Sequence, residues 1–244
     1  EMIARREGIG DVLAEGSARA AEQIGGDARY FAMHVKGQEL AMHEPRGKYN
    51  VGIGYAISEI GADHLVVTHA PTMVNPESAT FKSVRPLGIT VPQPAMTFSA
   101  EKMKHFFILE SWNSLEKVIG YCFFGPVPRA FIEVDEVLES IRAASGWELS
   151  AAEALQIGER AINMARVFNL REGFSRRDDT LPERLFQSLE NGLLEGQVMS
   201  RQEFEQALSI LYEFKGWDVQ TGMPTRERLE ALSLGWAADL AGIA

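Results

Sequence analysis

Cys122 is the only cysteine of the chain, and its side chain is the one best suited to bind a metal or act as a nucleophile. It follows Gly120 and precedes Phe123. A lone thiol can equally be a small buried hydrophobic group, so the residue type by itself leaves both interpretations open. Because one cysteine cannot form an intrachain disulfide, it agrees with a reducing compartment, and we expect a cytoplasmic protein.

Histidines are the second set of candidates, because an imidazole exchanges protons near neutral pH. His64 and His69 are five residues apart, which does not fit the i, i+4 zinc pair of a helix. Together with Asp63 they could still line one loop. His105, inside a predicted helix, is interpreted as structural, and a hydrogen-bonded or surface role is the simpler alternative for every histidine.

Three further patterns indicate structure more than chemistry. Gly52-Ile53-Gly54 resembles the start of a dinucleotide fingerprint, but Ile57 stands at the third glycine position and no strand precedes it, so we expect close helix packing. Polar residues spaced along 158–173 suggest pairing inside a helical bundle. Residues 176–179 are interpreted as a solvated turn.

The composition excludes several classes of protein. Of 244 residues, 45% are hydrophobic and 24% charged, which is typical of a folded chain and excludes a disordered or collagen-like one. The net charge of −10 argues against a nucleic-acid partner, because an acidic surface repels phosphates. No apolar run approaches the roughly 20 residues of a membrane span, and charges interrupt the N-terminal segment, so neither a membrane partner nor a signal peptide is expected.

The elements that must position these residues are mostly helices. Ser99, Ser150, Ser200 and Thr225 are predicted N-caps, and Ser150 and Ser200 stand three residues before a glutamate. Residues 30–36 are expected to form a short strand or an extended segment. Helices are predicted over residues 11–24, about 50–60, from 99 towards 122, 134–144, 151–168, 201–211 and, as the last one, 225–232.

The fold class expected from this pattern is all-α and multihelical, because no convincing strand follows Ser99. Six of the ten prolines fall between residues 45 and 94, so residues 65–98 are predicted to be mostly loop. Apolar residues interleave these prolines, so the loop either packs over a pocket or is disordered. We expect a helical and loop domain over 1–98 and a helical domain over 99–244, and the opening residues suggest the continuation of a longer protein.

Short motifs in a fixed order cover nearly the whole chain. They stand at residues 6–11, 13–16, 34–40, 45–47, 54–58, 61–64, 120–122, 158–163, 166–173, 178–184, 212–218 and 222–225. Together they resemble the C-terminal, all-helical part of the aldehyde:ferredoxin oxidoreductase family, the tungsten-pterin enzymes.

The resemblance implies a [4Fe–4S] cluster and a tungsten (or molybdenum) atom held by two pterins, both at a junction with an N-terminal β domain that this chain lacks. Cys122 is similar to the fourth cluster ligand, and a cubane needs three more thiolates, so this chain alone is expected to hold no cofactor. Gly120 and the backbone of Phe123 match positions that contact the cofactors. The pterin-binding aspartate of the family is replaced here by Lys117, a cation that cannot accept a hydrogen bond.

His64 matches the family's histidine near the metal, which the resemblance links to proton transfer. The proline-rich loop would then shape the substrate channel. The implied reaction oxidises an aldehyde to a carboxylic acid and sends electrons through the cluster to ferredoxin. The expected partners are ferredoxin, the missing N-terminal domain, the aldehyde and, as a further candidate, a second copy of the chain in a homodimer.

Two alternatives remain open at this stage. Relatives in the family act on other substrates such as an aromatic acyl-CoA, and Lys117 leaves room for such a change. A cofactor-free helical interaction module is the other alternative, also motivated by Lys117.

Overall fold

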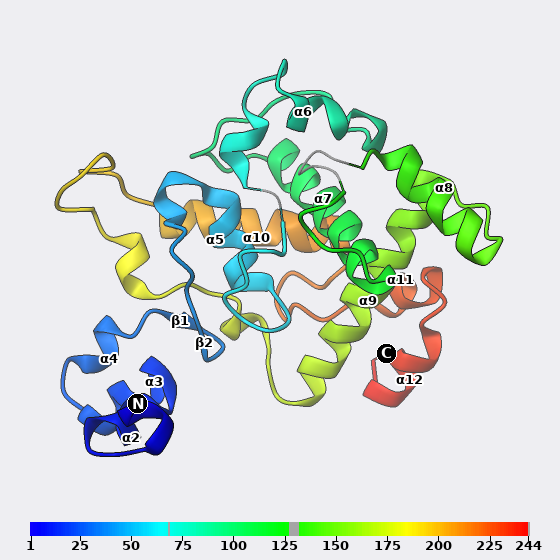
Figure 1. Cartoon of the computed structure of the whole chain (residues 1–244). Coiled ribbons are helices and arrows are strands. Elements are labelled where there is room, and N and C mark those ends of the chain that lie inside the picture. The colour runs from blue at the N-terminus through cyan, green and yellow to red at the C-terminus, as the bar shows by residue number, and fades with distance from the viewer. Residues whose placement is uncertain (68, 127–131, 244) are drawn as a thin grey trace.

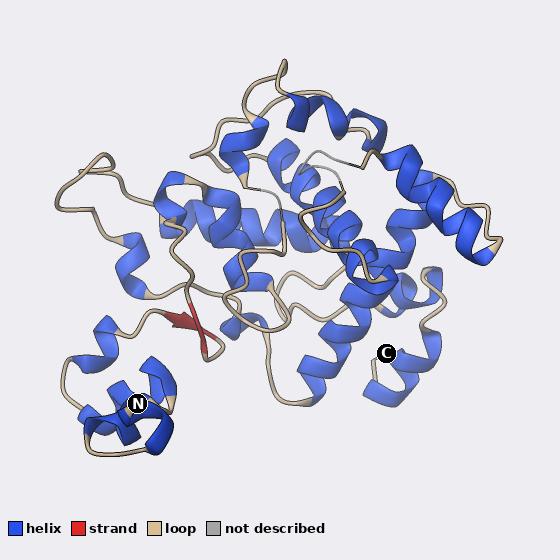
Figure 2. Cartoon of the chain, in the orientation of Figure 1, coloured by secondary structure: helices blue, strands red, loops and turns tan. Residues whose placement is uncertain are grey.

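A computed structural model describes residues 1–67, 69–126 and 132–243. Helices dominate the described chain, and its two paired strands form one short antiparallel hairpin (Figures 1 and 2). The all-α, multihelical fold is therefore confirmed. The α-helices and strands are α1 Met2–Arg5, α2 Ile9–Leu13, α3 Gly16–Ile24, α4 Ala28–Phe31, β1 His34–Val35, β2 Gln38–Glu39, α5 Tyr49–Ile57, α6 Ala79–Ser83, α7 Ala100–Ile119, α8 Val134–Ser145, α9 Ala151–Arg171, α10 Arg201–Lys215, α11 Arg226–Ala231 and α12 Gly235–Ala241.

The predicted helix over residues 11–24 is wrong as a single element. The structure has two helices there, α2 and α3, separated at residues 14–15. Gly16, the first residue of α3, has a φ of 81°, a left-handed value that a continuous right-handed helix does not contain. Helices α2, α3 and α4 lie together at one end of the molecule, and β1 and β2 lie between them and the other helices (Figure 1).

The long helices begin where their capping residues predict. The side chains of Ser99, Ser150, Ser200 and Thr225 each accept a hydrogen bond from the backbone N–H three residues later. Ser150 and Glu153 form the complete reciprocal capping box at the start of α9. These caps confirm the starts of α7, α9, α10 and α11.

The helix that follows Thr225 is not the last one. It ends at Ala231, and α12 follows after a turn in which Ser233 has a φ of 59°. The prediction of one final helix over 225–232 is therefore corrected to two short helices. Their apolar sides pack together with Val167 of α9 in a small core of their own.

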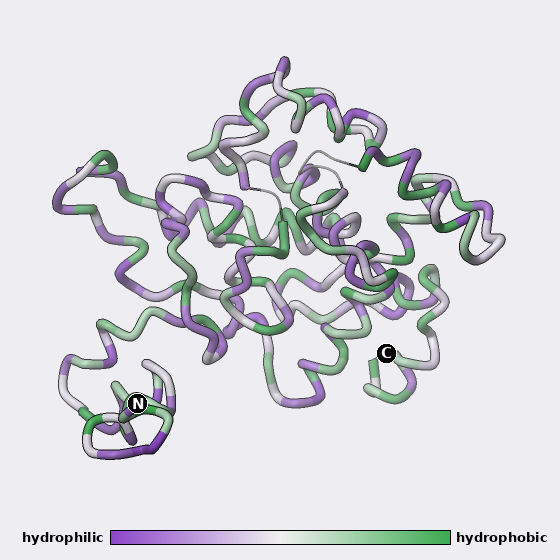
Figure 3. The backbone as a smooth tube through the Cα atoms, viewed as in Figure 1, coloured by the Kyte–Doolittle hydropathy of each residue, from purple (hydrophilic) through white to green (hydrophobic). Residues whose placement is uncertain are grey.

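The largest core joins α5 to α7 and α10. Its members include Val51 on α5, Phe106 on α7 and Leu211 on α10, so residues before and after position 98 share one apolar interior. The division into domains 1–98 and 99–244 stays a prediction. Hydrophobic and hydrophilic residues alternate along the long helices (Figure 3), and among the described helices none is long and apolar enough to cross a membrane.

The proline-rich segment 65–98 is mostly loop, as predicted, interrupted by α6 and two short 3-10 turns at Ala70–Met73 and Arg85–Leu87. Much of its apolar content is buried against the main core, including Val66, Phe81 and Ile89. These side chains hold the segment against the helices. Its expected place over a pocket stays a prediction.

Candidate functional site

The loop that carries His64 leaves α5 and turns sharply at Gly61. Gly61 has a φ of 98°, and a Cβ atom there would lie 2.3 Å from the carbonyl oxygen of Val35. Only glycine fits this close approach to the strand hairpin. The loop then closes on itself, because the backbone N–H of Leu65 donates to Asp63 Oδ1 over 2.8 Å. His64, between these two residues, is half-buried.

Three histidines meet around this loop. The ring of His43 lies with its centroid 4.8 Å from that of His64 and 4.4 Å from that of His69, and the last two centroids are 6.1 Å apart. The ammonium of Lys48 reaches Nδ1 of His43 at 2.8 Å and Nδ1 of His69 at 3.4 Å. The expected grouping of His64 with His69 is therefore found, and His43 and Lys48 are additions that sequence reasoning did not single out.

The end of α7 presents Cys122. Gly120 closes the helix in the left-handed conformation, and the N–H groups of Gly120 and Tyr121 donate to the last free carbonyls of the helix. The chain then turns through residues 122–125, where Gly125 N–H donates to the carbonyl oxygen of Cys122. The thiol of Cys122 is exposed, and the half-buried Phe123 stacks edge-on against Phe124.

Two contacts bring the His64 loop against the C-terminal half of α7. The amide of Asn113 donates to the carbonyl oxygen of Val66 over 3.2 Å, and Lys117 Nζ lies 3.6 Å from Asp63 Oδ2. His64 and Cys122 thus come from two segments, distant in the sequence, that share one helix as their support. Lys117 is thus engaged with a carboxylate next to His64.

Glu116, beside Lys117, is buried. Burial raises the pKa of its carboxyl group to about 8, and the nearby indole of Trp112 offsets only part of that rise. Neither carboxylate oxygen makes a hydrogen bond of normal geometry within the described part of the chain. Glu116 therefore favours the neutral acid at pH 7.

The described side chains do not form a metal site by themselves. Within residues 1–67, 69–126 and 132–243, no three His, Cys, Asp or Glu side chains are grouped so that they could hold a metal ion. A cubane takes four thiolates, and the chain has one cysteine. Cys122 fits the role of one ligand among four, exposed where other residues can reach it.

A buried ionic cluster, here named the Asp179 cluster (Lys36, Arg166, Asp179 and Tyr212), corrects the sequence interpretation of residues 176–179. Asp179 is not solvated, because its side chain is completely buried. Lys36 Nζ lies 2.7 Å from Oδ1, Arg166 lies 2.8 Å from Oδ2, and the Tyr212 hydroxyl donates to Oδ2. The expectation that polar residues along 158–173 pair inside the bundle holds for Arg166.

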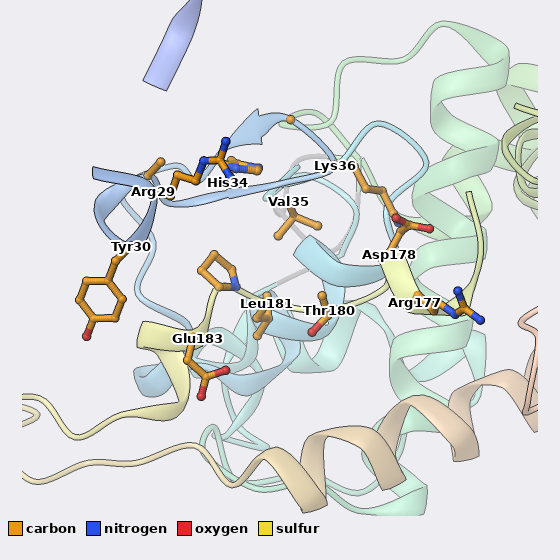
Figure 4. A pocket seen from close by; sticks show the side chains of 13 residues that line it. Arg29, Tyr30, His34, Val35, Lys36, Arg177, Asp178, Thr180, Leu181 and Glu183 are labelled. Atoms are coloured by element: carbon orange, nitrogen blue, oxygen red, sulfur yellow. The ribbon is translucent and has the colours of Figure 1, made fainter. Parts of the chain in front are cut away.

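A cavity lies elsewhere, between the strand hairpin and residues 177–183 (Figure 4). It encloses about 440 Å³ and is lined by Arg29, His34, Val35 and Leu181, among others. Neither His64 nor Cys122 lines it, so the cavity and the two candidate residues are separate features of the molecule.

The described structure is a multihelical body with a histidine loop packed against α7 and an exposed cysteine just beyond the end of that helix. Comparison with known proteins gives the family. The family model for domains 2 and 3 of aldehyde ferredoxin oxidoreductase matches residues 1–234. The chain therefore belongs to the aldehyde ferredoxin oxidoreductase family, as its motifs indicated.

Relatives within the family are longer than this chain. It is 35% identical over 234 residues to the tungsten-containing aldehyde ferredoxin oxidoreductase of Pyrococcus abyssi, covering 95% of this chain and 35% of that protein. It is 29% identical to the aliphatic sulfonate oxidoreductase, WOR-like subunit, of Pyrococcus furiosus, covering 97% of this chain and 34% of that one. The chain thus spans about a third of the relatives it matches.

A solved structure shares the fold. The active site complex BamBC of benzoyl coenzyme A reductase, in complex with 1,5-dienoyl-CoA, superposes with a TM-score of 0.67 at 22% identity. The match covers 98% of this chain and 38% of that one.

Proposed function

We propose that this chain is the C-terminal part of a tungsten- or molybdenum-pterin oxidoreductase that oxidises an aldehyde to a carboxylic acid and passes the electrons through a [4Fe–4S] cluster to ferredoxin. The observation that carries the proposal is the exposed thiol of Cys122 at the end of α7, on the helix that also supports the His64 loop. The names of the tungsten-containing relatives supply the substrate class, the metal and the electron acceptor.

In this proposal Cys122 provides one of four thiolates to the cluster, and the other three come from the part of the longer protein that this chain does not include. The backbone at Gly120 and Phe123 faces the pterins. The metal-pterin centre would supply the two-electron oxidation of the substrate when bound. The left-handed Gly120 cap fixes where the helix stops and therefore where the thiol emerges.

His64 handles protons in this proposal. Conversion of an aldehyde and one water molecule to a carboxylic acid releases two protons and two electrons, and a base near the reacting carbon must accept at least one of the protons. His64 is half-buried, and no hydrogen bond to its ring nitrogens is formed within residues 1–67, 69–126 and 132–243. Its ring is therefore available to take a proton and release it to solvent.

The decisive experiment measures metals and activity in the full-length protein. We expect iron together with tungsten or molybdenum, and aldehyde-dependent reduction of ferredoxin. Cys122→Ser should lose cluster iron, and His64→Asn should keep both metals but lose about 10²–10⁴-fold in turnover. His34→Asn, on β1, is the matched control and should keep its activity.

Three outcomes would contradict the proposal. Well-folded full-length protein without iron and without tungsten or molybdenum would refute a cofactor enzyme. Unchanged iron in Cys122→Ser would favour the cofactor-free interaction module. Turnover of aromatic acyl-CoA esters in place of aldehydes would favour the second candidate, which Lys117 motivates because the family's pterin-binding carboxylate is absent at that position.

A further inference from the structure

The three histidines around Lys48 do not have equivalent surroundings. Lys48 Nζ lies 2.8 Å from Nδ1 of His43 and 3.4 Å from Nδ1 of His69. An ammonium group has three donors and no lone pair, so both of these ring nitrogens must act as acceptors. A ring that accepts at Nδ1 is a neutral imidazole with its proton on Nε2.

The other nitrogen of His69 agrees with this assignment. His69 Nε2 lies 3.1 Å from the backbone carbonyl oxygen of His64. A carbonyl can only accept, so His69 Nε2 must carry the proton and donate it. Both contacts of His69 therefore require the same tautomer, and its N–H holds the main chain of His64 in place.

We propose that Lys48 is the positioning residue of this cluster: its ammonium keeps His43 and His69 neutral and Nε2-protonated, and so reserves proton uptake for His64. A proton on His43 would put a second positive charge 2.8 Å from the ammonium, with no lone pair left between them. Among the described residues, Lys48 makes no hydrogen bond to the ring of His64. The His64 ring can therefore accept a proton without placing a second positive charge against the ammonium.

Two other titratable groups described near the cluster, Asp63 and Tyr55, are engaged in contacts of their own. Asp63 is paired with Lys117 at 3.6 Å and accepts from the backbone of Leu65. The Tyr55 hydroxyl donates to the carbonyl oxygen of His43 over 3.2 Å. Burial raises the pKa of Tyr55 to about 12, so it stays a neutral donor over the whole range in which histidines titrate.

This inference deepens the proposed role of His64, and its first test needs neither metals nor activity. In the full chain with ¹⁵N-labelled histidine, long-range ¹H–¹⁵N spectra report the protonation of each ring nitrogen. We expect Nδ1 of His43 and His69 to be unprotonated from pH 8 to pH 5. In Lys48→Met at least one of His43 and His69 should titrate over this range or show the Nδ1–H tautomer.

Two controls separate the positioning role from general damage. Lys48→Arg keeps a cationic donor and should retain the native tautomers. Lys82→Met removes an exposed lysine that is paired with Glu77 and should change no histidine signal. Protonation of Nδ1 of His43 or His69 in the native chain at these pH values, or unchanged tautomers in a folded Lys48→Met variant, would overturn the inference.

The failure of this inference can be told apart from the failure of the proposed function. In full-length protein, Lys48→Met should shift the pH profile of turnover, and Lys48→Arg should restore it. Native tautomers as expected, together with full activity of His64→Asn, would leave the Lys48 assignment standing and refute the catalytic role of His64. Loss of activity in His64→Asn together with unchanged tautomers in Lys48→Met would leave the catalytic role of His64 standing and refute the Lys48 assignment.

Discussion

Two buried acids show how differently a carboxyl group can be accommodated in this protein. Asp179 is surrounded by the cations of Lys36 and Arg166 and by the Tyr212 hydroxyl. Glu116 is buried without such partners in the described chain, and its pKa rises to about 8. At the scale of single residues, burial without a cationic partner favours the neutral form of the Glu116 carboxyl.

Removing the carboxylate of Asp179 should therefore destabilise the fold strongly. In Asp179→Ala two buried cations lose their common counter-charge, and we expect a loss of about 3–5 kcal/mol in the free energy of unfolding. Urea denaturation followed by circular dichroism measures it. Glu183→Ala, which breaks an exposed pair with Arg201, is the control and should cost no more than about 1 kcal/mol. Equal midpoints for the two variants would contradict the structural role of the Asp179 cluster.

The raised pKa of Glu116 predicts that the stability of the protein depends on pH. Its pKa is about 8 in the folded chain against an ordinary 4.5, so the folded state binds an extra proton between these values. Stability should then fall as the pH rises from about 5 to 8, by up to about 1.4 kcal/mol for each unit of pKa difference. Glu116→Gln stays neutral, so its unfolding free energy should fall less over this range. Parallel stability curves for the two proteins would show that Glu116 ionises normally.

Helix α7 is the element on which the candidate site depends. It packs against α9 and α10, supports the His64 loop through Asn113, and ends at the cap that presents Cys122. Its contact with α9 is very close at Gly158, where a Cβ atom would lie 1.8 Å from the carbonyl oxygen of Ser111. Because that neighbour is backbone, a side chain at position 158 would force the two helices apart.

We therefore expect Gly158→Ala to destabilise the protein, although alanine favours a helix by about 1 kcal/mol over glycine. Overpacking of this kind costs about 1–3 kcal/mol, and the backbone clash places this variant at the upper end. Gly235→Ala on α12 is the matched control, since the nearest atom to its added Cβ is a side-chain carbon at 3.5 Å. Thermal melting of both variants tests the difference, and an unchanged melting temperature for Gly158→Ala would contradict the close crossing of α7 and α9.

At the scale of the whole molecule, the chain spans about a third of the length of the relatives it matches. It matches the family model for domains 2 and 3 of aldehyde ferredoxin oxidoreductase. In the proposed function, the exposed Cys122 would bind a cofactor together with the remainder of a longer protein. Its accessibility should therefore change when the remainder is present.

We expect the Cys122 thiol of the chain to react rapidly with Ellman's reagent under native conditions, because it is exposed. In the full-length protein with its cluster assembled, the same cysteine should be protected until the iron is removed by a chelator. The rate of thiol modification measures both states. Full reactivity in the iron-loaded protein would show that Cys122 is not a cluster ligand.

The sequence by itself determined the family, the helical class and the starts of the long helices. Those features depend on residues close together in the chain, such as Ser150 and Glu153 in the capping box, and on short motifs in a fixed order. It also pointed to His64 and Cys122 as candidates, and their roles stay predictions.

Only the tertiary structure showed which side chains meet. The burial of Asp179 depends on Lys36 and Tyr212, which lie 143 and 33 residues away. Lys48 joins His43 to His69 because the loop after α5 folds back over the residues before that helix. Charges and hydrogen bonds act through space, so residues that look solvated or isolated in the sequence acquire their chemistry when distant segments pack together.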